Sequence, residues 1–140
     1  MKIESRIGKS TCPASNIYQF ITDLNNLEGL IPGERVKDWQ SDKDQCQFTV
    51  SPVGKMGMRI REKEPHSLVK ITSDRDISQY NFTLWIQLKE VSQEDTRIKI
   101  TVQPEVNQFL LPMIKSPLRQ FVESLVDQME KFEFPPNHEA

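Results

Sequence analysis

The sequence predicts an α+β domain in which a curved antiparallel sheet of six or seven strands wraps a long C-terminal helix. Hydrophobic residues recur with a period of two from Val36 to Val106, which is typical of strands that bury one face. Only short polar turns separate these strands, so no crossover helix can join them and the sheet must be antiparallel. Near the end of the chain the period changes to 3.6, which predicts one long amphipathic helix.

The composition indicates one folded domain, which we expect to span residues 1–134 and to be followed by a tail at 135–140. The 140 residues are 36% hydrophobic and 27% charged, which suits a single core. Eighteen Lys and Arg nearly balance 20 Asp and Glu, and this argues against a nucleic-acid binder. Without a signal peptide or an apolar run that could span a bilayer, we expect a cytoplasmic protein with Cys12 and Cys46 reduced.

The N-terminal segment predicts one strand followed by two short helices. Alternation of Ile3, Ser5 and Ile7 on one side predicts a strand over residues 2–11. Pro13 suits the first turn of a helix. The apolar stripe of that helix, and then of a very short second helix, comprises Ile17, Phe20, Ile21, Leu24, Leu27, Leu30 and Ile31.

The middle of the chain predicts the sheet, with turn clusters such as Ser41–Asp44 between the strands. The cleanest alternation is in residues 80–89. The expected strands are 36–40, 46–50, 58–61, 68–72, 80–89 and 97–102.

The last helix is predicted to begin with Ser116 as its cap and Pro117 in its first turn. Pro135 and Pro136 end it. Its apolar stripe comprises Leu118, Phe121, Val122, Leu125, Met129 and Phe132.

Two segments resemble the START-like superfamily, also called SRPBCC or helix-grip. They are SRIGKSTCPASNIYQFITDLNNLEGLIPG, which is similar to the family's opening strand and helices, and PLRQFVESLVDQMEKF, which is similar to its last helix. The resemblance covers residues 1–134. It implies a cavity between the sheet and the last helix that often holds a lipid, a polyketide or another apolar molecule. Some members are polyketide cyclases or dehydratases, while others carry ligands or assist other proteins.

The inward positions of the strands and the last helix are apolar, which indicates either a packed core or the lining of a cavity. Our first hypothesis is therefore binding of a hydrophobic small molecule without catalysis. No cluster of His, Cys, Asp or Glu has the spacing of metal ligands, so we expect no metal and no cofactor. The residues expected to contact the ligand are Phe48, Met58, Ile60, Ile71, Phe82, Leu84, Ile86, Ile100, Met113, Phe121 and Leu125.

The alternative hypothesis is a cyclase or dehydratase that uses the same cavity. Glu62 continues the alternation of Met58 and Ile60, so it could point inward, where burial would raise the pKa of its carboxyl group. Tyr80 could supply a hydroxyl. A strand that bends near Glu62 would instead leave its side chain at the rim.

A third hypothesis is a non-catalytic interaction module. The apolar segment Phe109–Ile114 precedes the last helix and can be a lid, an exposed patch for a membrane or a partner, or a distorted first turn packed on the sheet. Trp85 faces away from the core by parity, which indicates a homodimer contact on the outer face of the sheet.

Overall fold

A computed structural model describes residues 2–31, 36–50, 54–78 and 80–136 of the chain. In this described part, eight strands form one antiparallel sheet in the order β1-β8-β7-β6-β5-β4-β3, with β2 also paired to β8. The elements are β1 (Ile3–Glu4), β2 (Gly8–Ser10), α1 (Ala14–Ile21), the 3₁₀ helix η1 (Leu24–Gly29), β3 (Val36–Ser41), β4 (Gln45–Val50), β5 (Gly54–Glu64), β6 (Leu68–Ser73), β7 (Asn81–Ser92), β8 (Asp95–Glu105) and α2 (Leu111–Lys131).

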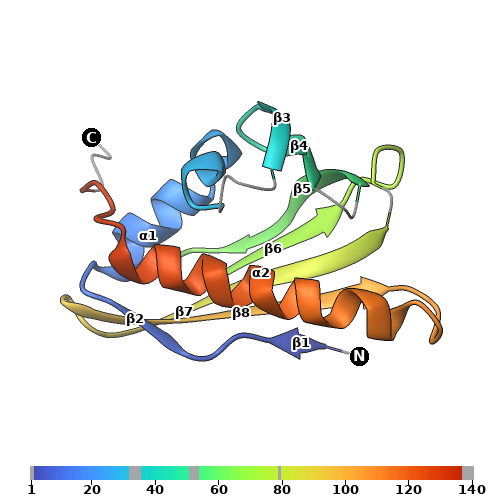
Figure 1. Cartoon of the computed structure of the whole chain (residues 1–140). Coiled ribbons are helices and arrows are strands. Elements are labelled where there is room, and N and C mark those ends of the chain that lie inside the picture. The colour runs from blue at the N-terminus through green and yellow to red at the C-terminus, as the bar shows by residue number, and fades with distance from the viewer. Residues whose placement is uncertain (1, 32–35, 51–53, 79, 137–140) are drawn as a thin grey trace.

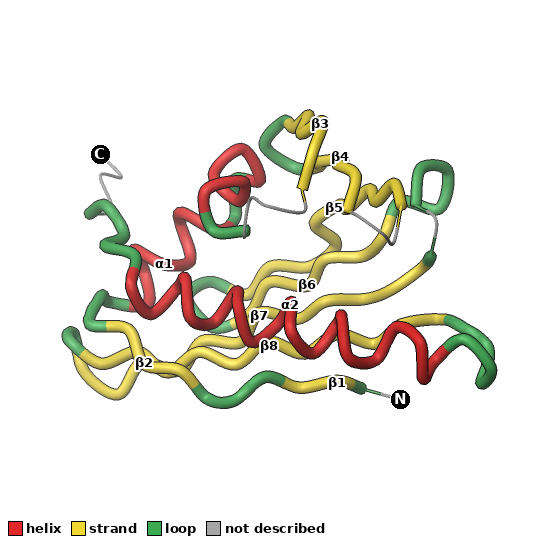
Figure 2. Tube along the Cα trace, viewed as in Figure 1, coloured by secondary structure: helices red, strands yellow, loops and turns green. Residues whose placement is uncertain are grey.

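The sheet curves around α2, and this confirms the predicted fold class (Figure 1). Helix α2 lies against β1, β2 and β8, whereas α1 packs on β6 and β7, and η1 packs on β3 and β4. The two layers are clear in the tube view, where the helices lie on one side of the sheet (Figure 2). In the part of the chain that the structure describes, no helix is long and apolar enough to cross a membrane.

The predicted first strand is divided into β1 and β2 by a bulge at Ser5. Ile3 pairs with Val102 and Gly8 pairs with Ile98. The N-terminal segment therefore advances by five residues where β8 advances by four. The Ser5 backbone N–H donates to the Ile100 carbonyl (2.8 Å), and the Ser5 hydroxyl oxygen accepts from the Ile100 N–H (2.9 Å). The extra residue reverses the side-chain alternation. The prediction for Ile7 is therefore wrong, because its side chain is 65% exposed.

Helix α2 begins at Leu111, six residues before Pro117, where the predicted helix began, so Ser116 is not its cap. Pro112 occupies the first turn, where its missing N–H costs nothing, and Pro117 lies inside the helix. The Asn107 carboxamide oxygen accepts from the N–H groups of Phe109 and Leu110, both at 3.0 Å, and so orders the preceding turn.

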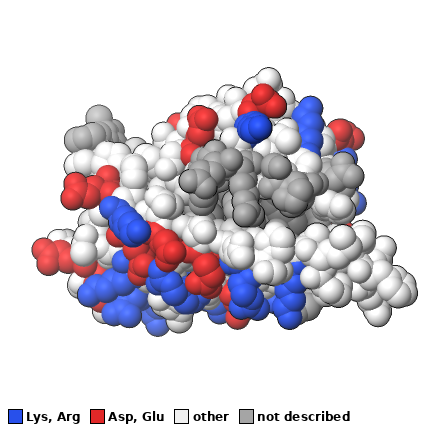
Figure 3. Space-filling model, in the orientation of Figure 1, with Lys and Arg blue, Asp and Glu red and all other residues white. Residues whose placement is uncertain are grey.

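Charged contacts fix the second half of α2 to the bulged N-terminal segment. The Arg6 guanidinium pairs with Glu123, Asp127 and Glu130 of α2. Backbone N–H groups add to this, since Arg6 N–H donates to Glu123 (2.7 Å) and Lys9 N–H donates to Glu130 (2.8 Å). Figure 3 shows the acidic and basic side chains gathered over this half of the helix.

This cluster predicts an acid-sensitive contribution to stability. The hydrogen bond from Arg6, followed by the N–H of Lys9, holds the pKa of Glu130 below its ordinary value of 4.5. Because the folded-state pKa is the lower one, the Glu130 carboxylate stabilises the fold above pH 4.5, and this contribution is lost as the pH falls through the folded-state pKa. We expect Glu130→Gln to lower the free energy of unfolding by about 1 kcal/mol at neutral pH. Urea denaturation across the acidic range should show this difference shrinking below about 4.5.

The exposed Glu133, just after α2, provides the control. Glu133→Gln should leave the free energy of unfolding at neutral pH nearly unchanged, because its side chain is exposed. A loss in Glu130→Gln that stays constant down to strongly acidic pH would contradict the role of its carboxylate.

Candidate functional site

The inner face of the sheet contains most of the residues expected to contact a ligand. Seven of them are buried in the core, namely Phe48, Met58, Ile71, Leu84, Ile86, Ile100 and Leu125. Ile60, Phe82 and Phe121 are half-buried and pack against the same core. Met113 differs from the expectation, because its side chain is 73% exposed. It lies in the first turns of α2, well before Val122, the first buried residue of that helix.

Helix α2 has two different halves. Its buried residues are Val122, Leu125, Val126 and Met129, which all lie in the second half. In the first half, Leu118 and Phe121 are only half-buried. Eleven half-buried apolar residues pack on the core in the described part of the chain, and seven of them come from β3, β4, β5, β7 and the first half of α2: Val36, Trp39, Val50, Ile60, Phe82, Leu118 and Phe121.

Trp39 of β3 belongs to this half-buried group and was not selected from the sequence. Its ring stacks on Phe48, with the ring centroids 5.1 Å apart and the planes 13° apart. The indole Nε1–H is buried and has no hydrogen-bond partner, which typically costs about 1–3 kcal/mol. The pairing of β3 with β4 shifts between Lys37 and Gln40, and Asp38 has a positive φ of 58°. This irregularity breaks the period-two pattern that would have identified Trp39.

The acid–base candidates lie apart from this inner face. The pairing of β5 with β6 shifts between Ile60 and Glu62, so the alternation that predicted an inward Glu62 does not continue. Lys70 pairs in register with both Glu62 and Trp85. The Glu62 carboxylate is 63% exposed and lies 3.5 Å from Lys70 Nζ. Tyr80 is half-buried just before β7. The strand irregularity therefore removes Glu62 from the interior.

Neither cysteine forms a disulfide. Cys46 is buried, and this burial, followed by the nearby charge of Asp42, raises its pKa to about 12. A thiol with so high a pKa is protonated at neutral pH and is a poor nucleophile. Within residues 2–31, 36–50, 54–78 and 80–136, no group of three His, Cys, Asp or Glu could hold a metal ion.

The outer face of the sheet around Trp85 is partly covered by the chain itself. Lys2 Nζ lies 4.9 Å from the ring centroid and Lys70 Nζ lies 6.0 Å from it. Such cation–π contacts occupy the surface that a partner would use. A homodimer at Trp85 stays a prediction.

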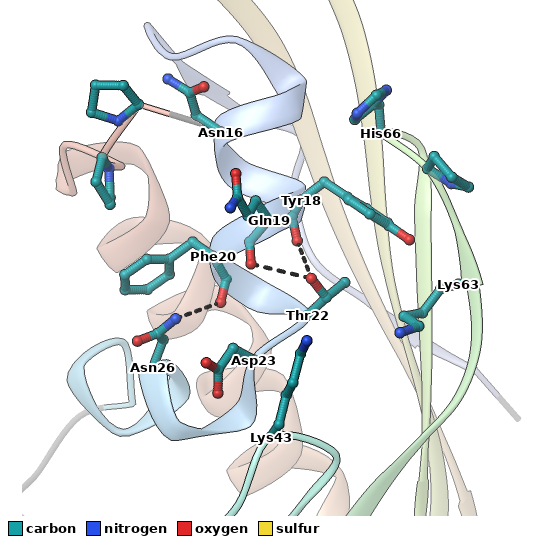
Figure 4. Close-up of a pocket in the computed structure, with 13 residues that line it drawn as sticks. Asn16, Tyr18, Gln19, Phe20, Thr22, Asp23, Asn26, Lys43, Lys63 and His66 are labelled. Atoms are coloured by element: carbon teal, nitrogen blue, oxygen red, sulfur yellow. Dashed lines mark hydrogen bonds between the residues drawn. The ribbon is translucent and has the colours of Figure 1, made fainter. Parts of the chain in front are cut away.

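A separate open pocket of about 650 Å³ lies on the solvent side of α1 (Figure 4). Its wall includes Tyr18 and His66, whose rings meet edge to face with centroids 5.6 Å apart. None of the residues predicted to contact a ligand lines this pocket. The lining comes from α1, η1 and the link between them, the turn after β3, the end of β5 with the turn that follows, and the C-terminal segment: Asn16, Tyr18, Gln19, Phe20, Thr22, Asp23, Asn26, Lys43, Lys63, Pro65, His66, Pro135 and Pro136.

Several polar groups of this pocket already form hydrogen bonds with the backbone. The Thr22 hydroxyl donates to the Tyr18 carbonyl (2.8 Å), and the Asn26 amide donates to the Phe20 carbonyl (3.0 Å). Burial raises the pKa of Tyr18, so its hydroxyl stays protonated at neutral pH. The pocket lining includes two lysines, Lys43 and Lys63, and one aspartate, Asp23. Its charge therefore weakly favours the binding of a small anion. Sequence periodicity holds no signal for a pocket assembled from such distant turns.

Solved structures share this architecture. A START superfamily protein from Mycobacterium smegmatis superposes with a TM-score of 0.73 at 12% identity, over 92% of this chain and 94% of that one. The chain has the START-like helix-grip fold.

Two further solved structures have this fold. A conserved protein from Geobacillus kaustophilus has a TM-score of 0.70 at 13% identity, over 94% of this chain and 93% of that one. Norcoclaurine synthase from Thalictrum flavum, in complex with dopamine and hydroxybenzaldehyde, has a TM-score of 0.68 at 14% identity, over 94% of this chain and 84% of that one. No family model and no curated protein matches the sequence.

Proposed function

We propose that the protein binds an apolar small molecule, lipid-like or polyketide-like, between the sheet and the first half of α2. The observation that carries this proposal is the incomplete burial of the apolar residues from β3, β4, β5, β7 and α2. Apolar side chains that are left half-buried gain free energy when a ligand covers them, at about 25 cal/mol per Å². The second half of α2, in contrast, contains all the buried residues of that helix and is closely packed.

The unpaired Trp39 N–H adds a polar feature to this apolar surface. A small rotation of the indole would let it donate to an ether, carbonyl or hydroxyl oxygen of a ligand. Since an unsatisfied buried donor is costly, a ligand that accepts this hydrogen bond would gain affinity.

Binding without catalysis is favoured over the cyclase or dehydratase alternative. Glu62, the carboxylate on which that alternative depended most, is exposed and paired with Lys70. Norcoclaurine synthase holds two small aromatic molecules on this fold, which supports a ligand of similar character. Tyr80, which is half-buried just before β7, is the other proton carrier that the alternative invokes.

Trp39 provides the test, because the chain contains only two tryptophans. In a Trp85→Phe variant, the fluorescence of Trp39 alone should change saturably as oleic acid or naringenin is added. In that background, Leu118→Gln should weaken binding about tenfold, because it replaces an apolar contact with an amide.

His66→Ala serves as the control, since His66 lines the separate pocket beside α1. It should leave the affinity unchanged. No saturable change with either compound, or a loss of affinity in His66→Ala and none in Leu118→Gln, would contradict the proposal.

A further inference from the structure

We propose that the exposed start of α2 together with the turn before it, residues 107–115, docks on the surface of an anionic lipid bilayer. Phe109 is 88% exposed and Met113 is 73% exposed, the two highest values among the exposed large apolar side chains of the described residues. The others lie far away in sequence: Ile7, at 65%, in the bulged N-terminal segment, and Val91, at 60%, in β7. Phe109 and Met113 alone form an exposed pair, four residues apart.

The backbone holds these two side chains in a fixed arrangement. The Asn107 carboxamide binds the N–H groups of Phe109 and Leu110, and the Leu110 carbonyl accepts from the N–H of Met113 (3.0 Å) and of Ile114 (3.3 Å). The pair therefore projects from an ordered helical turn. An ordered apolar projection loses little conformational entropy when it inserts into a bilayer interface.

The charges along α2 favour an anionic surface at this end. From Val106 to Val122 the only ionisable side chains are Lys115 and Arg119. The acidic residues of α2 begin at Glu123 and are held by Arg6. In the view of Figure 3, most of the surface at the end of the molecule where α2 begins is uncharged, whereas acidic and basic side chains crowd the other half of the helix. Cations just behind an apolar projection are typical of helices that bind anionic lipids.

The nearest acidic residue before this segment does not oppose such docking. Glu105 at the end of β8 lies 2.9 Å from the Arg75 guanidinium, so its charge is compensated. The start of α2 therefore has a net positive charge that no described acidic residue of its own segment cancels.

A bilayer fits this surface better than a protein partner or a second copy of the chain. A stable protein interface buries about 1,200–2,000 Å² with close shape complementarity. Two projecting side chains cannot supply such an area, but they can insert between lipids. Because docking needs only the outer surface of this segment, it does not depend on the proposed ligand, and each proposal can fail without the other.

Sedimentation with large unilamellar vesicles tests the inference. We expect the full chain to bind vesicles of phosphatidylcholine that contain one third phosphatidylglycerol, and to bind pure phosphatidylcholine vesicles much more weakly. Phe109→Asp should lower the partition coefficient about tenfold or more. Charge reversal in Lys115→Glu should reduce binding to the anionic vesicles, and added salt should do the same.

Val91→Asp is the matched control, because Val91 is also an exposed apolar residue but lies in β7. It should bind like the wild type, and circular dichroism should show that all variants are folded. The inference is overturned if the wild type ignores anionic vesicles, or if Phe109→Asp binds as well as Val91→Asp. It is also overturned if light scattering shows a dimer that Phe109→Asp dissociates, since the pair then serves self-association.

Discussion

Leu125→Ala should lower the free energy of unfolding by about 2–5 kcal/mol, the range for truncating a fully buried leucine. Leu125 is 1% exposed and belongs to the hydrophobic core in which α2 packs on the inner face of the sheet. The truncation leaves a cavity that neighbouring side chains cannot fill, because the second half of α2 is held in place by Arg6. Urea denaturation followed by circular dichroism measures the loss.

The same helix supplies the matched controls. Leu118→Ala should cost clearly less, because Leu118 is half-buried, and Met113→Ala should change the stability by less than about 0.5 kcal/mol. If Leu118→Ala costs as much as Leu125→Ala, the first half of α2 is also closely packed. The division of the helix into a structural half and a half open to a ligand would then be wrong.

The sequence predicted the fold because its two periods are strong where the chain is regular. Leu84 and Ile86 in β7 and Ile98 and Ile100 in β8 alternate without interruption, and all four are buried. Each of these strands pairs with its neighbour along most of its length. Local alternation and tertiary packing therefore agree, and the alternation alone is sufficient to predict these two strands.

The errors arise where one extra residue interrupts a strand. Ser5 bonds to Ile100, which is 95 positions away, and no local pattern shows that this hydroxyl will replace a main-chain acceptor. A bulge reverses the face of the residues that follow, which explains both the exposed Ile7 and the outward Glu62. Trp39 was overlooked for the same reason.

The start of α2 was misplaced because two prolines that suit a first turn, Pro112 and Pro117, lie five residues apart. Ser116 precedes Pro117 as a standard cap, whereas Leu110, the residue before the observed helix, makes no side-chain cap. Capping rules therefore favour the later start. The choice matters for function, since the earlier start places Phe109 and Met113 on an ordered surface rather than in a loop.

Gly8→Ala should destabilise the fold by about 1–3 kcal/mol through overpacking. A Cβ atom at Gly8 would lie 2.5 Å from Val126 Cγ1 and 3.2 Å from Glu130 Cγ. Val126 is fully buried and cannot move aside, so α2 would have to shift away from β2. That shift would also lengthen the hydrogen bond from Lys9 N–H to Glu130. Thermal and urea denaturation should both show the loss.

Gly29→Ala is the control, because nothing lies within 4 Å of the position its Cβ would take. A second variant separates overpacking from any other effect of the added methyl group. If the clash with Val126 is the cause, then Val126→Ala should destabilise the Gly8→Ala protein less than it destabilises the wild type, since it removes the clashing atom. Equal losses in the two backgrounds would show that β2 and α2 do not meet at this point, and the close contact of α2 with the N-terminal strand would have to be abandoned.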